Sequence, residues 1–348
     1  MQGKCGLFFE TYRAEAAVFQ TGFQKACLGL FLAALLACPL VLDTYLVSVL
    51  NLMCIAVIGA VSLNLLTGVC GQISLGHGAF IGVGAYAAAQ ATLAGVPFLA
   101  ALLLGGAAAA VVGMFFGVPS LRLKGIYLAI ATLAAQLILE YVFLHWESVT
   151  GGSRGLMLDP PKILGFAFEG ERRMFYLLLA VAACSLIVVK NVLRTRHGRA
   201  FVSIRDFYLS AEIAGVNLFA YKLAAFGLSS FLAGVAGGLW AHYTMFLSAE
   251  QFGIGLSISY LAMIIIGGLG SVAGSVMGAV FMTLLPELLT AGTRALSGVW
   301  PDIGGQIVAL REGVFGVVLM LFLIFEPEGL ANRWRLIKAY WKLYPFAH

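Results

Sequence analysis

The sequence predicts an all-α, multi-pass membrane protein with about ten transmembrane segments and with both termini in the cytoplasm. Hydrophobic residues make up 61% of the 348 residues and charged residues only 11%, and the mean hydropathy is +0.98. A soluble globular domain has roughly 45–50% apolar and about 25% charged residues. In water this chain would therefore expose far too much apolar surface. A transmembrane helix needs about 20 mostly apolar residues, and such runs recur along the chain.

The predicted elements follow one another with short connections, and some spans are short or broken by glycine. Residues 1–25 have mixed charges and are expected to form a cytoplasmic lead-in, residues 26–326 the transmembrane domain, and residues 327–348 an amphipathic cytoplasmic tail on the lipid headgroups. The predicted spans are residues 26–42, 45–66, 81–93, 97–118, 125–145, 174–193, 223–244, 256–266, 272–289 and 313–325.

The orientation follows from a basic interval, residues 190–222, which holds six basic and two acidic residues. An excess of Lys and Arg marks cytoplasmic loops. With ten crossings, 15 of the 21 Lys and Arg residues fall inside. In the loop of residues 194–221, a short helix is predicted over residues 206–215, with Asp206 as its N-cap and Gly215 just past its end. So short a helix needs a surface to pack against.

The most distinctive stretch is residues 64–80, where glycines and polar side chains interrupt an apolar run. Irregular backbone at membrane depth survives only inside protein or beside a wet cavity, and polar intramembrane groups are functional candidates. Two interpretations stay open: the polar groups face a substrate path or a subunit interface, or the glycines form a packing seam, as the spacing from Gly78 to Gly82 allows. The candidate path residues are Asn64, Gln72, Ser74, Gly76, His77 and Gly78.

A second interruption lies in the other half of the chain. The predicted span of residues 256–266 is too short for a full crossing, and the glycine-rich turn of residues 267–271 follows it. By analogy with transporters built from internal repeats, paired broken segments indicate a binding path between the halves. Gly270, Gly274 and Gly278 recur at four-residue spacing and are predicted to pack against a neighbouring helix.

The longest external segment is residues 146–173, in which four basic residues balance four acidic ones. Basic residues should not be in excess on the outer side. Its residues Thr150, Gly151, Gly152 and Ser153 are consistent with a simple turn.

Several functions are disfavoured by missing motifs. The sequence has no G-x-x-x-x-G-K-[ST] phosphate loop, no H-E-x-x-H metal motif and no G-x-S-x-G nucleophile elbow. The six cysteines have no C-x-x-C spacing, so no metal site is predicted. The net charge of +5 lies at membrane edges, which indicates orientation and lipid contact rather than nucleic-acid binding. The carboxylates nearest the membrane interior are Glu140, Glu287 and Glu312, and all three lie at predicted span edges. Because none of them lies deep in a span, the driving energy must come from elsewhere.

Two motifs resemble those of the LivM-type permease subunits of branched-chain amino-acid ABC importers, over about residues 45–330. The more specific motif is Gly71-Gln72-Ile73-Ser74-Leu75-Gly76-His77. The other resembles the cytoplasmic coupling loop of such permeases and comprises Arg205, Asp206, Ala211, Glu212, Ala214 and Gly215, although Ile213 stands where the general importer motif has Ala. Small Ala and Gly residues would allow close approach to an ATPase subunit, and Arg205 and Glu212 would set the register by charge.

The resemblance implies a permease domain in a bacterial inner membrane that is not itself an enzyme. The implied partners are a LivH-type permease, two ABC ATPase subunits that bind ATP and Mg²⁺, and an extracytoplasmic solute-binding protein near residues 150–153; the chain itself needs no cofactor. The implied cargo is leucine, isoleucine or valine, with urea, short amides or other amino acids as alternatives. An ion-coupled carrier, or a membrane enzyme or scaffold, remains a different class of function.

Overall fold

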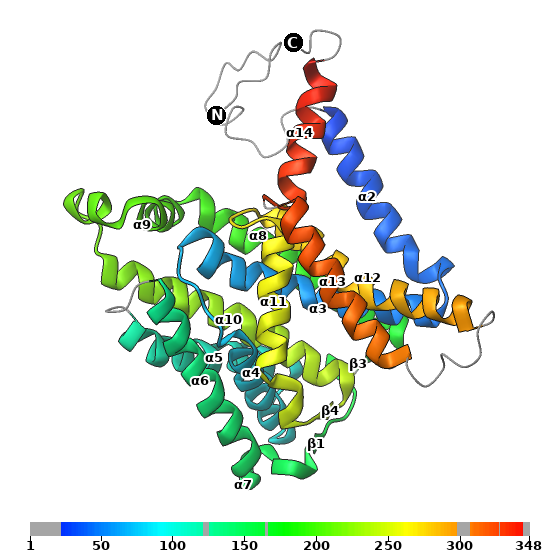
Figure 1. The fold of residues 1–348 in the computed structure, drawn as a ribbon. Coiled ribbons are helices and arrows are strands. Elements are labelled where there is room, and N and C mark those ends of the chain that lie inside the picture. Colours follow the sequence, from blue (N-terminus) through cyan, green and yellow to red (C-terminus); the bar gives the residue numbers. More distant parts are fainter. Residues whose placement is uncertain (1–21, 121–124, 164–165, 298–306, 327, 344–348) are drawn as a thin grey trace.

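The computed structural model describes residues 22–120, 125–163, 166–297, 307–326 and 328–343. Within these ranges the chain is a bundle of helices with two small strand pairs (Figure 1). The helices are α2 (Gly22–Val41), α3 (Thr44–Leu63), the π-helix η1 (Asn64–Val69), α4 (His77–Leu93), α5 (Phe98–Ser120), α6 (Ile126–His145), α7 (Glu147–Thr150), the short η2 (Gly152–Arg154), α8 (Glu171–Arg194), α9 (Arg196–Ile213), α10 (Leu218–Thr244), η3 (Ala249–Phe252), α11 (Ile254–Gly267), α12 (Val272–Ser297), α13 (Ile307–Phe325) and α14 (Leu330–Leu343). Strand β1 (Leu156–Met157) pairs antiparallel with β4 (Phe246–Leu247), and β2 (Lys162–Ile163) with β3 (Phe166–Ala167).

The predicted order of helices is confirmed, and the predicted number of spans agrees only roughly. Each of the ten predicted spans falls on a helix, namely α2, α3, α4, α5, α6, α8, α10, α11, α12 and α13. Among the described residues, seven helical stretches are long and apolar enough to cross a membrane. Helix α4 has only 17 residues, and α2 contributes a shorter apolar stretch, Gly29–Val41, among the residues whose side chains are described. The predicted lead-in lies almost wholly outside the described residues.

Helices α4, α5 and α10 form the tightest part of the core, because glycine brings their backbones together. A Cβ atom at Gly234 of α10 would lie 2.5 Å from Ala109 Cβ and 2.8 Å from the Gly105 carbonyl oxygen of α5. Small residues at helix interfaces permit this approach, and dispersion contacts then hold the helices together without a hydrophobic driving force in lipid.

Helices α11 and α12 meet in the same way. A Cβ atom at Gly274 would lie 2.5 Å from the Gly267 carbonyl oxygen, and one at Gly278 would lie 2.9 Å from the Gly267 nitrogen. The predicted packing role is confirmed for these two glycines. Gly270 is not on the same helix face, because it lies in the turn before α12 with a φ of +79°. It packs instead against η1, where a Cβ atom at Gly270 would lie 3.1 Å from the Gly68 carbonyl oxygen.

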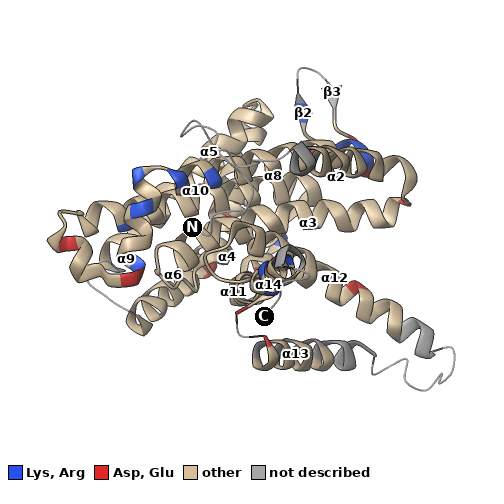
Figure 2. Cartoon of the chain, turned by 90° about the horizontal axis from the view of Figure 1, so that it is seen from above, with Lys and Arg blue, Asp and Glu red and all other residues tan. Residues whose placement is uncertain are grey.

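The two basic segments, α9 and α14, lie on the same side of the bundle. Both reach the turn that follows α11: a Cβ atom at Gly268 would lie 3.3 Å from Ala331 Cβ of α14, and one at Gly270 would lie 2.9 Å from Arg205 of α9. Helix α10 starts next to α9 and leads at its other end into strand β4, which pairs with β1 of the segment predicted to be external. Charged residues gather around α9, whereas most of the bundle carries few (Figure 2). This arrangement agrees with the orientation predicted from charge.

The helix that the sequence predicts on the cytoplasmic side begins earlier than expected. Helix α9 starts at Arg196, and the Thr195 side chain caps it by accepting a hydrogen bond from the His197 amide. A kink divides the helix at Phe207, whose φ and ψ are −150° and 88°. The predicted helix over residues 206–215 matches only the second half, and the extended residue before that half is Phe207 rather than Asp206. The predicted end is confirmed, since Gly215 has a φ of +85°.

Candidate functional site

The first interruption follows α3 directly, as the chain passes from α-helix to the π-helix η1 and then to irregular backbone. Gly71 has a φ of +72°, which favours glycine, and regular α-helix resumes only at His77. The Leu75 amide donates a hydrogen bond to Thr132 Oγ1 of α6 at 2.9 Å. A Cβ atom at Gly76 would lie 2.7 Å from the Thr132 carbonyl oxygen. The predicted break therefore lies against α6.

Side chains from two other helices cap the start of α4. The Gly78 amide donates to Ser257 Oγ of α11 at 2.7 Å, and the Ala79 amide donates to Gln136 Oε1 of α6 at 2.8 Å. The Ser257 hydroxyl donates to the same Gln136 oxygen at 3.0 Å, and Gln136 Nε2 donates to the Phe252 carbonyl at 2.7 Å. The first amides of any helix lack partners within it. Here completely buried side chains supply them.

His77 and Ser74 have no exposed surface in this conformation. His77 Nε2 lies 3.0 Å from Ser62 Oγ and 3.0 Å from the Gly59 carbonyl oxygen. The imidazole ring meets the Tyr260 ring edge-on, with 5.5 Å between centroids. These contacts join α4 to α3 and α11, so they favour the packing interpretation for His77, and for Ser74 its complete burial favours the same interpretation. Their place on a substrate path stays a prediction.

The surface offered by the break is apolar. Between η1 and α4, Gln72 and Ser74 are buried, Gly71 and Ile73 are exposed, and Leu75 is half-buried. Buried and exposed residues therefore alternate along this segment. Ile73 keeps 39% of its surface exposed. The polar residues singled out in the sequence thus face the chain's own interior, and their aliphatic neighbours face outward.

Asn64 joins the two interruptions. Its Oδ1 accepts a hydrogen bond from the Gly270 amide at 2.8 Å, and its Nδ2 donates to the Ser271 carbonyl at 2.9 Å. The side chain is almost fully buried. The two broken segments, predicted separately, are in direct contact.

Arg205 turns back toward the membrane domain. Its Nη1 donates to the Gly68 carbonyl at 2.9 Å, and its Nε donates to Asp206 Oδ1 at 2.9 Å. The Arg205 side chain stays 38% exposed, so its expected role in setting the register with an ATPase stays a prediction. Glu212 keeps an exposed side chain and remains a candidate for that role.

The second half of α9 presents apolar side chains to its surroundings outside the bundle. Ile213 is 88% exposed, and Phe207 and Leu209 are also exposed, as are Ala214 and Gly215. The remaining motif residue, Ala211, is buried in the main core cluster.

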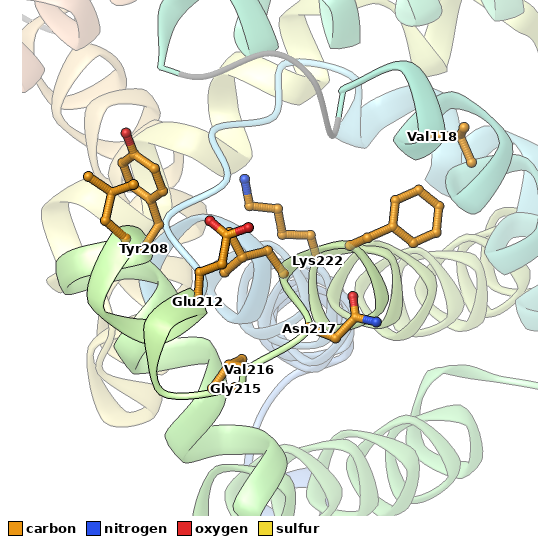
Figure 3. Close-up of a pocket in the computed structure, with 10 residues that line it drawn as sticks. Val118, Tyr208, Glu212, Gly215, Val216, Asn217 and Lys222 are labelled. Carbon is orange, nitrogen blue, oxygen red and sulfur yellow. The ribbon is translucent and has the colours of Figure 1, made fainter.

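A pocket of about 760 Å³ lies between the second half of α9 and the start of α10 (Figure 3). Glu212 from α9 and Lys222 from α10 lie on it with apolar neighbours. Its lining residues are Val118, Tyr208, Leu209, Glu212, Gly215, Val216, Asn217, Leu218, Phe219 and Lys222.

The turn that the sequence predicts on the external side is held by internal hydrogen bonds. Thr150 is buried, and its hydroxyl lies 2.7 Å from the Phe143 carbonyl and 2.8 Å from the Trp146 carbonyl. Gly151 and Gly152 have φ values of +72° and +54°. Of the four candidate residues for binding-protein contact, Ser153 offers an exposed side chain.

The sequence did not single out the residues that hold the first break in place. Thr132, Gln136 and Ser257 are buried and supply its hydrogen bonds. A lone Gln in an apolar span was the available signal, since such a group needs an internal partner. Ser and Thr are common in spans and gave none. Among the described residues no group of three or more His, Cys, Asp or Glu could hold a metal ion.

These features define a multi-pass helical membrane protein with interrupted inner helices and a basic helix, α9. The chain belongs to the family described as the permease component of branched-chain amino acid transport systems, whose model matches residues 45–323. The family consists of permeases of ABC importers, which are not themselves enzymes. The predicted resemblance is confirmed.

Two relatives named as LivM permeases are similar to this chain. The high-affinity branched-chain amino acid transport system permease protein LivM of Escherichia coli (strain K12) is 29% identical over 332 residues, covering 88% of this chain and 75% of the relative. A probable branched-chain amino acid transport permease protein LivM of Methanocaldococcus jannaschii is 26% identical over 66% of this chain and 67% of its own length.

A third relative is named for a different transport system. The autoinducer 2 import system permease protein LsrC of Salmonella typhimurium is 30% identical over 63% of this chain and 62% of its own length. No solved structure matches the chain significantly.

Proposed function

We propose that this chain is one of two permease subunits of an ATP-driven importer in the bacterial cytoplasmic membrane, with leucine, isoleucine and valine as cargo. The proposed assembly contains a LivH-type permease, two ATPase subunits and an extracytoplasmic solute-binding protein. The observation that carries the proposal is the exposed apolar half of α9, which lies outside the bundle on the basic side.

An ATPase subunit is the proposed partner of this half-helix. Exposed Phe207, Leu209 and Ile213 would gain by burial in a groove, and burying a large apolar side chain is worth about 1.5–3 kcal/mol. Exposed Ala214 and Gly215 permit close backbone approach, and Glu212 would select the register by charge. ATP and Mg²⁺ would be bound by the ATPase subunits, and closure of the ATPase pair would push α9.

The proposed path runs along the apolar face of the first break. Ile73 and Leu75 point away from the chain's own core, toward the side on which a homologous permease would complete the path. An aliphatic cargo suits such a wall because it needs few fixed polar groups. The buried side chains of Gln72, Ser74 and His77 would support this surface from the interior of the chain.

Cargo selection would fall mainly to the solute-binding protein, which we propose docks near Ser153. The similarity to LsrC permeases makes a different cargo the second candidate. Uptake competition separates the two: excess isoleucine and valine should block leucine uptake, whereas urea, short amides and autoinducer 2 should not.

Co-expression with the other subunits tests the assembly. Affinity purification through this chain should recover both ATPase subunits and the second permease, and proteoliposomes with enclosed ATP and external binding protein should accumulate labelled leucine. Vesicles with a non-hydrolysable nucleotide are the control. Uptake by this chain alone that collapses with a protonophore would identify an ion-coupled carrier instead, and an absence of any solute flux would favour a scaffold or enzyme.

A further inference from the structure

Arg205 occupies a position where the cytoplasmic helix meets the membrane domain. It lies at the end of the first half of α9, two residues before the kink at Phe207. Its guanidinium group bridges two segments, because Nη1 donates to the Gly68 carbonyl and Nε donates to the Asp206 carboxylate, both at 2.9 Å. Hydrogen bonds from an ionised donor are about twice as strong as neutral ones.

The backbone around the Arg205 side chain has the shape of a slot that only glycine permits. Gly71 and Gly270 both have positive φ values, +72° and +79°. A Cβ atom at Gly71 would lie 2.9 Å from Arg205 Cγ, and one at Gly270 would lie 2.9 Å from Nη1. Each glycine belongs to a different interruption of the bundle. The side chain therefore contacts both broken segments at once.

Asn64 completes the junction. Its amide group holds the Gly270 amide and the Ser271 carbonyl, and it lies one turn before Gly68 on the π-helix η1. A displacement of η1 must therefore be shared by the turn after α11. The side chains of Arg205 and Asn64 together connect three segments: helix α9, the first break and the second break.

We propose that Arg205 is a positioning residue that transmits displacement of α9 to both broken segments, through the Gly68 carbonyl directly and through Asn64 to the turn after α11. This inference rests on the proposed function, since it assigns the route by which ATPase closure reaches the path. Asp206, the next residue along α9 and the last before the kink, holds the guanidinium in place on the helix, and the Gly68 carbonyl accepts its other hydrogen bond. A displacement of α9 would therefore move the guanidinium against Gly68.

The test compares Arg205→Gln with Arg199→Gln in the complete complex reconstituted in proteoliposomes. Arg199 is exposed on the first half of the same helix, so its replacement removes the same charge away from the junction. Leucine uptake, ATP hydrolysis and subunit composition are measured on the same preparation. For Arg205→Gln we expect assembly and ATP hydrolysis to persist while uptake per ATP falls at least about fivefold, the lower end of typical coupling between sites. Arg199→Gln should keep the wild-type ratio.

Each outcome decides the matter. An unchanged ratio of uptake to hydrolysis in Arg205→Gln overturns the proposal, and so does a parallel loss of both with the ATPase subunits dissociated, which would make Arg205 a docking residue. If Arg205→Gln does not assemble, Arg205→Lys is used, because one ammonium cannot reproduce the bridge between Gly68 and Asp206. A reduced ratio then supports transmission, and a wild-type ratio overturns it. Failure of the wild-type complex to take up any solute would instead refute the proposed function.

Discussion

Replacing Gln136 by Met tests whether side chains from other helices hold the start of α4. Met has a similar length and shape, so no large cavity forms, and the change removes three hydrogen bonds: from the Ala79 amide, from the Ser257 hydroxyl and to the Phe252 carbonyl. At about 0.6 kcal/mol for each hydrogen bond inside a membrane protein, the loss is about 2 kcal/mol. If the two backbone groups stay unpaired, at about 1–3 kcal/mol each, the loss reaches about 6 kcal/mol.

Unfolding of the purified chain in mixed micelles by a denaturing detergent measures this loss. A change of about 2 kcal/mol alters the ratio of folded to unfolded protein by about 30-fold. The matched control is Leu137→Met, one residue further along α6, where the side chain is 55% exposed. It should change stability by less than about 0.5 kcal/mol. The reasoning fails if Gln136→Met is as stable as this control, because the amides at the start of α4 would then have other partners.

Three further substitutions separate packing from coupling. His77→Ala should destabilise the assembled complex by about 2–5 kcal/mol, the range for truncating a large buried side chain. The melting temperature of the complex measures this loss. If uptake is lost while stability is unchanged, His77 has a direct role in the path. Glu212→Lys should abolish leucine uptake while membrane insertion, read by membrane fractionation, stays intact, and wild-type uptake in vesicles would remove Glu212 from the docking surface. Gly270→Ala should cost about 1–2 kcal/mol from its left-handed backbone and should disturb the Arg205 contact, so an unchanged melting temperature and an unchanged uptake per ATP would count against the glycine slot.

The hydropathy of the sequence predicted the helices well because lipid imposes a simple rule. Each span must satisfy its own backbone hydrogen bonds and present apolar side chains, so apolar runs mark helices without knowledge of their neighbours. The interruption after α3 was also predictable, since glycine density such as that from Gly68 to Gly78 is incompatible with a regular span. These are local properties of the chain.

The facing of side chains was not predictable, because it depends on how each element is rotated against the others. Ser74 and His77 are predicted to lie on the path, and the structure buries both side chains while it leaves Ile73, next to Ser74, exposed. The early start of α9 had a usable signal. Ala200, Phe201 and Ile204 lie on one helical face and are all buried, a spacing typical of an amphipathic helix.

The interruption itself constrains how the bundle can move. A continuous helix would need no help from its neighbours, whereas the amides of Leu75, Gly78 and Ala79 depend on side chains from α6 and α11. Separating these elements inside lipid would leave several buried polar groups without partners, at a cost of several kcal/mol each in the absence of water. The start of α4 should therefore travel with α6 and α11 as one body. The junction of Arg205, Gly68 and Asn64 contacts the turn that follows α11, so we expect a force on α9 to reach this body through that turn.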